Sequence, residues 1–183
     1  MMQPLQQLGV ALRALADAEH YLFTQSDLSS LFPQHNPATL AVLLSRAVHS
    51  GVLQRVCRGI YVYPDAYTNH GLLLYHAAAR LRAGEFNYIS LESALSDAGV
   101  ISQLPLNWIT LMSSGRNRIV DCGTWGHIEF IHTRRAAAAV APLLTWDTRC
   151  HLWRANVSLA LQDMKYTRRN TDLIDWEVAH EFV

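Results

Sequence analysis

A helix pattern that runs directly into a two-strand hairpin limits the fold more than any other feature of the sequence. In "NPATLAVLLSRAVHSG", Asn36 is a good N-cap, Pro37 takes the first helical position and Gly51 provides a C-terminal stop. The segments "LQRVC" and "GIYVY" then alternate and are rich in β-forming residues, which predicts two short strands. The pair Arg58-Gly59 predicts the tight turn between them.

Two further helices are predicted before this unit. Leucines recur at helical spacing and favour an amphipathic helix over residues 4–18 with a buried stripe of Leu5, Leu8, Leu12 and Leu15. Thr24 and Asp27 have the spacing of a capping box, which predicts a short helix through Leu31. Three helices followed by a hairpin are typical of a winged helix-turn-helix. In that fold the third helix enters the major groove and the hairpin, or wing, lies against the DNA backbone or minor groove.

The rest of the chain reads as a second domain built around a small sheet. "PDAYTNHG" is the expected linker, with Pro64 ending the last strand and Thr68 or Asn69 capping a new helix that ends at Gly84. Strands are predicted in "EFNYISL", "NWITLM", "NRIVD" and "HIEFIH". Helices are predicted in "LESALSDAGV", from about Arg134, and over residues 153–168. The predicted fold class is α+β, with a winged helix-turn-helix over residues 1–66 and a mixed α+β domain over residues 67–183.

Charge is distributed unevenly in a chain of zero formal net charge. The interval between Asp27 and Asp65 holds no acidic residue, although Arg46, Arg55 and Arg58 lie in it. Fourteen of the 15 lysines and arginines are arginine, whose planar fork suits phosphate and guanine edges. The acid-free interval is also the part that would face DNA in the predicted fold, so double-stranded DNA is the expected partner. A winged helix that binds another protein instead of DNA remains an alternative.

The predicted DNA-binding residues fall into three groups. The third helix supplies Asn36, Thr39, Val42, Arg46 and His49, and the wing supplies Arg55 and Arg58 as anchors to the backbone. Val42 is apolar, but a valine can contact a thymine methyl group. A basic segment, "SSGRNR", reads as a hairpin turn, and its Arg116 and Arg118, with Arg168 and Arg169, would widen the footprint.

Motifs of catalysis and metal binding are not found in the sequence. It has no C-x-x-C, H-E-x-x-H, P-loop or G-x-S-x-G pattern, so no catalytic residue, metal or cofactor is predicted. Asp121 and Glu129, on adjacent predicted strands, resemble the metal-binding half of a nuclease site. The lysine expected two residues after the glutamate is Ile131, which makes a nuclease the weakest alternative. The two acids are then interpreted as solvent-facing residues of a hairpin, and the protein as a non-enzyme.

Three scattered cysteines, with no secretory signal and no apolar run long enough to span a membrane, predict a cytoplasmic protein.

The ordered set "SGVLQRVCRGIYVYP", "YISLESALSDAGVISQLP" and "NWITLM" resembles the AbiEi antitoxin family of type IV toxin–antitoxin systems, over residues 25–144. The resemblance implies a repressor that binds inverted repeats in its own promoter as a pair of protomers and counteracts a toxin of the nucleotidyltransferase superfamily. It implies a recognition helix over residues 36–50, a wing over residues 53–63, and an antitoxin domain that includes "SLESAL" and the following strands. Family members often continue past the position of Val183, so the resemblance implies DNA binding more firmly than toxin neutralisation.

Overall fold

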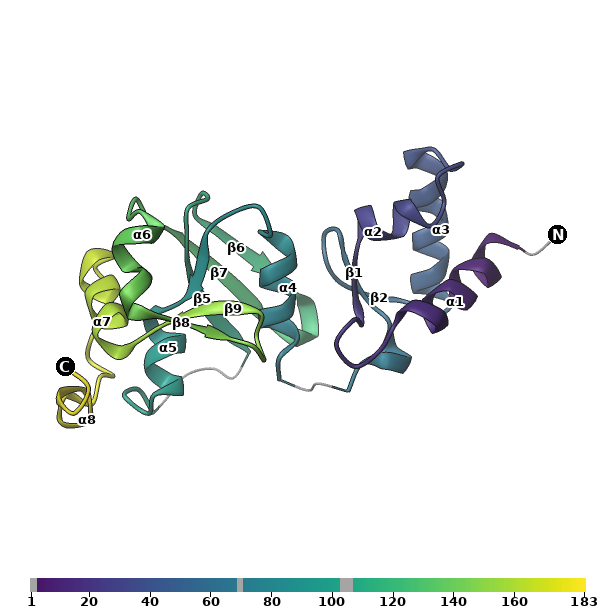
Figure 1. The fold of residues 1–183 in the computed structure, drawn as a ribbon. Coiled ribbons are helices and arrows are strands. Elements are labelled where there is room, and N and C mark those ends of the chain that lie inside the picture. The colour runs from purple at the N-terminus through teal and green to yellow at the C-terminus, as the bar shows by residue number, and fades with distance from the viewer. Residues whose placement is uncertain (1–2, 69–70, 103–106) are drawn as a thin grey trace. The chain divides into compact units, whose positions relative to one another are not determined.

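The computed structural model describes residues 3–68, 71–102 and 107–183. The chain divides into two compact units, Met1–Leu73 and Leu74–Val183 (Figure 1). This division falls a few residues after the boundary expected between residues 66 and 67. The helix cap expected at Asn69 lies outside the described residues.

Unit 1 is a winged helix-turn-helix. Its helices are α1 (Pro4–Leu15), α2 (Gln25–Ser30) and α3 (Pro37–His49). Its strands are β1 (Leu22–Thr24), β2 (Gln54–Cys57) and β3 (Ile60–Val62), and they form an antiparallel sheet in the order β1-β3-β2. The predicted hairpin is β2–β3, whereas β1 was not predicted. A 3-10 turn, η1 (Pro64–Ala66), follows β3.

The helix ends follow the local sequence signals at α2 and α3. Thr24 and Asp27 cap α2 reciprocally, each side chain bonding the other's backbone N–H, at 3.0 and 2.7 Å. The Asn36 side chain accepts a hydrogen bond from the backbone N–H of Thr39 at 2.8 Å at the start of α3. Gly51 follows the end of α3 with a φ of +78°, a conformation that glycine adopts without strain.

The predicted end of the first helix was wrong. α1 stops at Leu15 because Ala16 is extended and the Asp17 carboxylate accepts the backbone N–H groups of Glu19 and His20, which forms a turn. The leucine stripe is therefore shorter than predicted, since Leu15 is 52% exposed.

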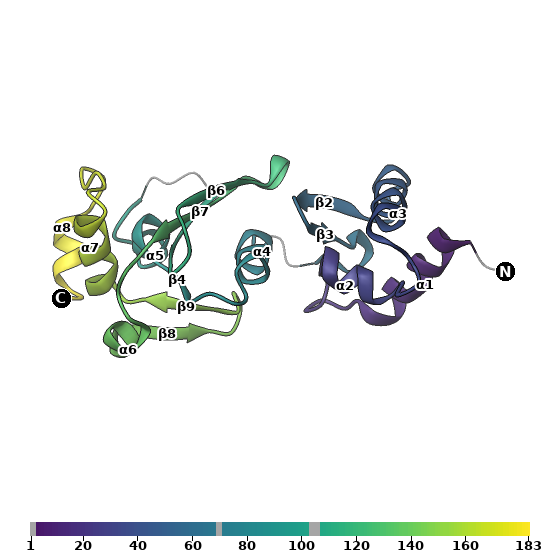
Figure 2. The same cartoon turned by 90° about the horizontal axis from the view of Figure 1, so that it is seen from above.

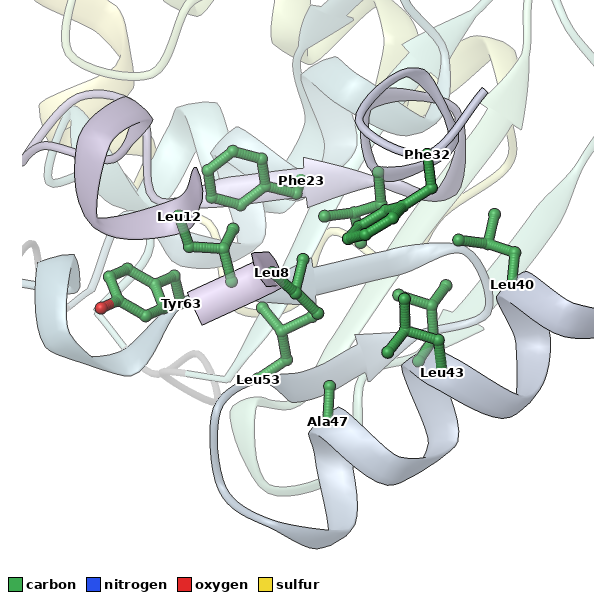
Figure 3. Packing of buried hydrophobic residues seen from close by; sticks show 11 residues of the cluster. Leu8, Leu12, Phe23, Phe32, Leu40, Leu43, Ala47, Leu53 and Tyr63 are labelled. Carbon is green, nitrogen blue, oxygen red and sulfur yellow. The ribbon is translucent and has the colours of Figure 1, made fainter. Parts of the chain in front are cut away.

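One apolar core joins the helices of unit 1 to its sheet. Leu8 and Leu12 of α1 are completely buried, and they pack with side chains of α3 and the strands (Figure 3). The buried members of this cluster are Leu8, Leu12, Phe23, Leu28, Phe32, Leu40, Leu43, Leu44, Ala47, Leu53 and Tyr63. The core uses the inner side of α3, and the opposite side of that helix is left for solvent or a partner.

Unit 2 is a mixed α+β unit around a six-stranded sheet, as predicted for the fold class. The strands are β4 (Asn87–Ile89), β5 (Trp108–Ser113), β6 (Arg118–Asp121), β7 (His127–His132), β8 (Leu144–Asp147) and β9 (Leu152–Ala155), in the order β6-β7-β5-β4-β9-β8. The pairs β5–β7 and β4–β9 are parallel and the others antiparallel.

The helices that accompany this sheet are short. They are α4 (Leu73–Leu81), α5 (Leu91–Asp97), α6 (Ala137–Val140), α7 (Val157–Tyr166) and α8 (Trp176–His180). Two 3-10 turns, η2 (Gly123–Trp125) and η3 (Ala141–Leu143), connect strands and helices.

Two predictions for unit 2 were wrong. The alanine-rich helix is a single turn, since Pro142 lacks the N–H that would continue it, and the strand β8 follows. Trp153 lies in strand β9, and the following helix begins at Val157, where Asn156 provides the N-cap.

The segment "SSGRNR" is also not a hairpin turn, because β7 lies between β5 and β6 in the sheet. It crosses the end of β7 instead. There the His132 backbone N–H donates to the Asn117 side chain at 2.6 Å, and His132 Nδ1 donates to the Gly115 carbonyl at 2.9 Å.

Candidate nucleic-acid interface

Helix α3 separates its side chains into a core side and an open side. Leu40, Leu43 and Ala47 point into the core (Figure 3). The predicted contact residues Thr39, Val42, Arg46 and His49 are all exposed, and Val42 is 52% exposed despite being apolar. The exposure of these four residues agrees with the helical pattern, and their contact with DNA stays a prediction.

Asn36 was predicted as a DNA contact, and the structure shows that it also caps α3. Its side-chain oxygen satisfies the Thr39 N–H at the first turn of α3, where backbone donors have no partner within the helix. The residue is exposed as well, so it lies at the edge of the open side of α3. Any effect of changing it on DNA binding therefore has to be separated from loss of the cap.

The wing is fixed at its turn by hydrogen bonds. Gly59 has a φ of +84°, which closes the two-residue connection between Cys57 and Ile60. Its carbonyl accepts the backbone N–H of Gln25, the first residue of α2, at 3.0 Å. Arg55 Nε donates to the Cys57 carbonyl at 3.3 Å within the wing. The wing is thus held by one hydrogen bond within it and by another to the first residue of α2.

Helix α3 and the wing border one hollow of about 340 Å³. Its lining residues are Gln25, Ala41, Leu44, Ser45, Val48, Arg55, Arg58, Gly59 and Tyr61. The charged side chains among them are the two arginines. Sequence reasoning named both arginines but missed Ala41, Ser45, Gln25 and Tyr61. Helical spacing from Leu44 and Val48 could have placed Ala41 and Ser45 beside the wing.

The four arginines of unit 2 that were predicted to contact DNA differ in their exposure and in their partners within the unit. Arg116 is exposed in the connection between β5 and β6, where its carbonyl accepts a bond from the Arg82 guanidinium, and Arg118 is exposed at the first position of β6. Arg168 is exposed in a left-handed conformation, with a φ of +55°. Arg169 is instead paired with Glu92 at 3.1 Å and Glu129 at 2.7 Å. Its charge is neutralised within the unit, which argues against the predicted contact of Arg169 with DNA.

The same ion pairs bear on the nuclease alternative. Strands β6 and β7 are adjacent, as predicted, but Asp121 lies opposite His127 and Glu129 lies opposite Ile119. Glu129 is only 16% exposed and accepts bonds from Trp108 Nε1 at 3.1 Å and from Arg169. The prediction that Glu129 faces solvent was therefore wrong, while Asp121 is 75% exposed. A guanidinium lies against the carboxylate that a divalent metal would need.

Neither a cluster of metal-ligating side chains nor a membrane-spanning helix is found in residues 3–68, 71–102 and 107–183. No group of three or more His, Cys, Asp or Glu side chains in these ranges could hold a metal ion. Cys57, Cys122 and Cys150 are all buried. Burial and the neighbouring Asp147 carboxylate raise the pKa of the Cys150 thiol to about 12. No helix within the same ranges is both long and apolar enough to cross a bilayer.

Comparison with known proteins agrees with the architecture of unit 1. No curated protein matches the sequence. A family model described as "Transcriptional regulator, AbiEi antitoxin" matches residues 10–64, which run from α1 to the end of the wing. The resemblance noted further along, in "YISLESALSDAGVISQLP" and "NWITLM", lies beyond this match and stays a prediction. Residues 10–64, which include α3 and the wing, are therefore similar to the AbiEi antitoxin family of transcriptional regulators.

Proposed function

We propose that this protein represses its own operon by binding double-stranded operator DNA with α3 and the wing. The observation that carries the proposal is the hollow between these two elements. The charged side chains of its lining are Arg55 and Arg58, and all of its lining residues except Gln25 lie in the acid-free interval between Asp27 and Asp65. A cationic groove beside an exposed helix suits a phosphate backbone next to a major groove.

The proposed roles follow the position of each side chain. α3 enters the major groove, where Thr39, Arg46 and His49 reach bases or phosphates and Val42 meets a thymine methyl group. Arg55 and Arg58 hold the backbone from the wing. Two protomers occupy the two halves of an inverted repeat, in which protein and operator share a two-fold axis.

The antitoxin activity is proposed for unit 2. The family description supports an antitoxin in general terms. We propose that the toxin is a nucleotidyltransferase encoded in the same operon and that unit 2 counteracts it without the wing. Co-expression tests this division of labour, because a wing variant that no longer binds DNA should still rescue growth. Loss of rescue in a stably folded wing variant would assign neutralisation to unit 1 or to both units.

DNA binding is tested by a salt titration with the double variant Arg55→Ala/Arg58→Ala. Fluorescence anisotropy measures affinity for a duplex from the promoter upstream of the gene, between about 50 and 200 mM salt. Each phosphate contact contributes about 0.9 to the slope of log K against log salt, so the slope should fall by up to about 1.8. Arg134→Ala/Arg149→Ala removes the same charge from two exposed residues of unit 2 and serves as the control. Equal slopes in the two variants would remove the wing from the interface.

A second candidate function is a winged helix that binds a protein. The observation in its favour is the exposed Val42 on the outer side of α3, since apolar contacts are common at the centre of protein interfaces. This candidate predicts that Arg55→Ala/Arg58→Ala leaves partner binding nearly unchanged and that Val42→Lys abolishes it. Selection of a defined duplex from random DNA by the wild-type chain would favour the repressor instead.

A further inference from the structure

Strand β2 of the wing departs from the alternation of a regular strand. It is an outer strand of the unit 1 sheet and lies beside α3 (Figure 2), and its first two residues are exposed while its last two are buried. In the register with β3, Arg55 lies opposite Tyr61. Cys57 lies opposite Ile60, the neighbour of Tyr61, so Val56 is one additional residue on β2. Such an additional residue on one of two paired strands is a β-bulge.

The bulge bears on where the two arginines of the wing lie. Side chains three residues apart on a regular strand point to opposite faces of the sheet, whereas a bulge re-aims the side chains beside it. Arg55 and Arg58 are three residues apart, yet both border the hollow next to α3. Tyr61, the cross-strand partner of Arg55, borders it as well. The two cations of the wing therefore belong to one site.

Arg55 is oriented by a hydrogen bond within the wing. Its Nε donates to the Cys57 carbonyl at 3.3 Å, which leaves the two terminal nitrogens of the guanidinium for a ligand. These nitrogens carry their N–H groups in a planar fork that matches two oxygens of a phosphate. Among the residues that the structure describes, no carboxylate forms an ion pair with Arg55 or Arg58. Both charges are thus available to an anion.

The other residues that line the hollow suit the same ligand. Gln25, Ser45 and Tyr61 have side chains that can donate hydrogen bonds to an oxyanion, and none of the lining residues is acidic. The hollow measures about 340 Å³, which is ample for one phosphate group. Two cations with neutral donors around them, and with no carboxylate in the lining, favour an anion over a neutral or cationic ligand.

We propose that the hollow between α3 and the wing is a site for one phosphate group, which Arg55 and Arg58 bind together. The phosphate is either one of the operator backbone or free phosphate that competes with DNA for the site. For the first source the inference deepens the proposed function and rests on it. The shared site differs from two independent contacts, in which each arginine would bind a phosphate of its own.

The first test uses inorganic phosphate and no DNA. Phosphate replaces chloride at constant ionic strength while heteronuclear NMR follows the backbone amide signals of Ser45 and Gly59. In the wild-type chain these signals should shift to saturation, with a dissociation constant on the order of 1–10 mM. Arg55→Ala and Arg58→Ala should each weaken phosphate binding roughly ten-fold, because each removes a charged donor of the same site. A wild type without saturable shifts, or single variants that bind phosphate as the wild type does, overturn the proposal.

A control with unchanged net charge separates the position of Arg55 from its charge. Gln54→Arg/Arg55→Gln moves the guanidinium by one residue, to the other face of β2, at a position where the natural side chain is exposed. This variant should lose as much phosphate affinity as Arg55→Ala. Arg134→Ala/Arg149→Ala removes two exposed cations of unit 2 and should bind phosphate as the wild type does. The reverse pattern would mean that phosphate responds to net charge alone, and it would overturn the site.

The second test uses the promoter duplex and asks whether the two arginines share a phosphate of DNA. If they do, Arg55→Ala/Arg58→Ala should lower the slope of log K against log salt by about 0.9, whereas two separate contacts would lower it by about 1.8. The affinity losses of the two single variants should not add either, because both act on one ligand group. After the first substitution, the second should weaken binding by less than about two-fold.

The two tests separate failure of the site from failure of the proposed function. A fall in slope of about 1.8 with additive losses overturns the shared phosphate and keeps the wing in the DNA interface. If the wild-type chain binds no DNA, the proposed function fails, and the titration with inorganic phosphate alone decides the site. Inorganic phosphate that saturates the wild type should also weaken its binding to the duplex at constant ionic strength, and equal weakening of the Arg55→Ala/Arg58→Ala variant would contradict competition at this site.

Discussion

Asn36 offers a way to separate folding from DNA recognition at a single residue. Its side chain caps α3 through the 2.8 Å bond from the Thr39 N–H, and it lies at the edge of the proposed interface. Asn36→Ala removes the cap and should lower the free energy of unfolding by about 1 kcal/mol. In a unit of this size, such a loss corresponds to a fall of about 4–8 °C in melting temperature.

Two replacements keep the cap while they change the charge. Serine and aspartate are both good N-caps, so Asn36→Ser and Asn36→Asp should hold the melting temperature near that of wild type. Aspartate also interacts favourably with the positive end of the helix dipole, by about 0.3–1 kcal/mol. It nevertheless introduces a negative charge into an interval where the sequence has none, between Asp27 and Asp65. Asn36→Asp should therefore bind DNA more weakly than Asn36→Ser at equal or higher stability.

The assays are thermal unfolding followed by circular dichroism and anisotropy titration of the same preparations. The reasoning about the cap is refuted if Asn36→Asp loses as much stability as Asn36→Ala. The reasoning about the interface is refuted if Asn36→Asp and Asn36→Ser bind the duplex with the same affinity at low salt, where repulsion by phosphate is least screened.

Three further predictions concern stability. Leu44→Ala, at a core position that is 2% exposed, should lower the free energy of unfolding by about 2–5 kcal/mol in urea, and a loss below 1 kcal/mol would contradict the packing described for α3. Gly59→Ala should cost about 1–2 kcal/mol in the same assay through its φ of +84° alone, since no atom lies within 4 Å of the added Cβ; an unchanged urea midpoint would show that the turn relaxes. Burial raises the pKa of Asp163 above 3.8, so the folded state binds the proton more tightly than the unfolded state and stability falls as pH rises from 3.8 through the raised value. Asp163→Asn should flatten this part of the pH–stability curve, and a profile identical to wild type would contradict the assignment.

The parts of the fold that the sequence predicts well are those with local signals. Asn36, Pro37 and Gly51 mark the ends of α3, and the pair Arg58-Gly59 marks the wing turn, each within a few residues of the element it bounds. The strand β1 has no such signal. It is three residues long and exists because it pairs with β3, whose residues lie almost 40 positions further along the chain.

Errors in unit 2 have the same physical origin. A run of alanines favours a helix, but pairing with β9 determines that β8 follows so soon after Pro142. Glu129 is an ion-pair partner of Arg169, which follows α7 and lies 40 residues further along the chain. Helical or strand periodicity carries no information on such a partner. The sequence therefore identified Arg55 and Arg58 as a cationic pair but could not show that Arg169 is neutralised.

The unpredicted strand β1 also determines how the wing can act. Thr24 ends β1, pairs with Ile60 of β3 and caps α2 with its side chain. The next residue, Gln25, donates its backbone N–H to the Gly59 carbonyl of the wing turn. Because one strand end holds both the helix-turn-helix and the wing, a rotation of the wing would break the β1–β3 pairing and disturb the start of α2. Arg55 and Arg58 are then held beside α3 in the protein alone, and the proposed binding of DNA would lose less conformational entropy than it would with a mobile wing.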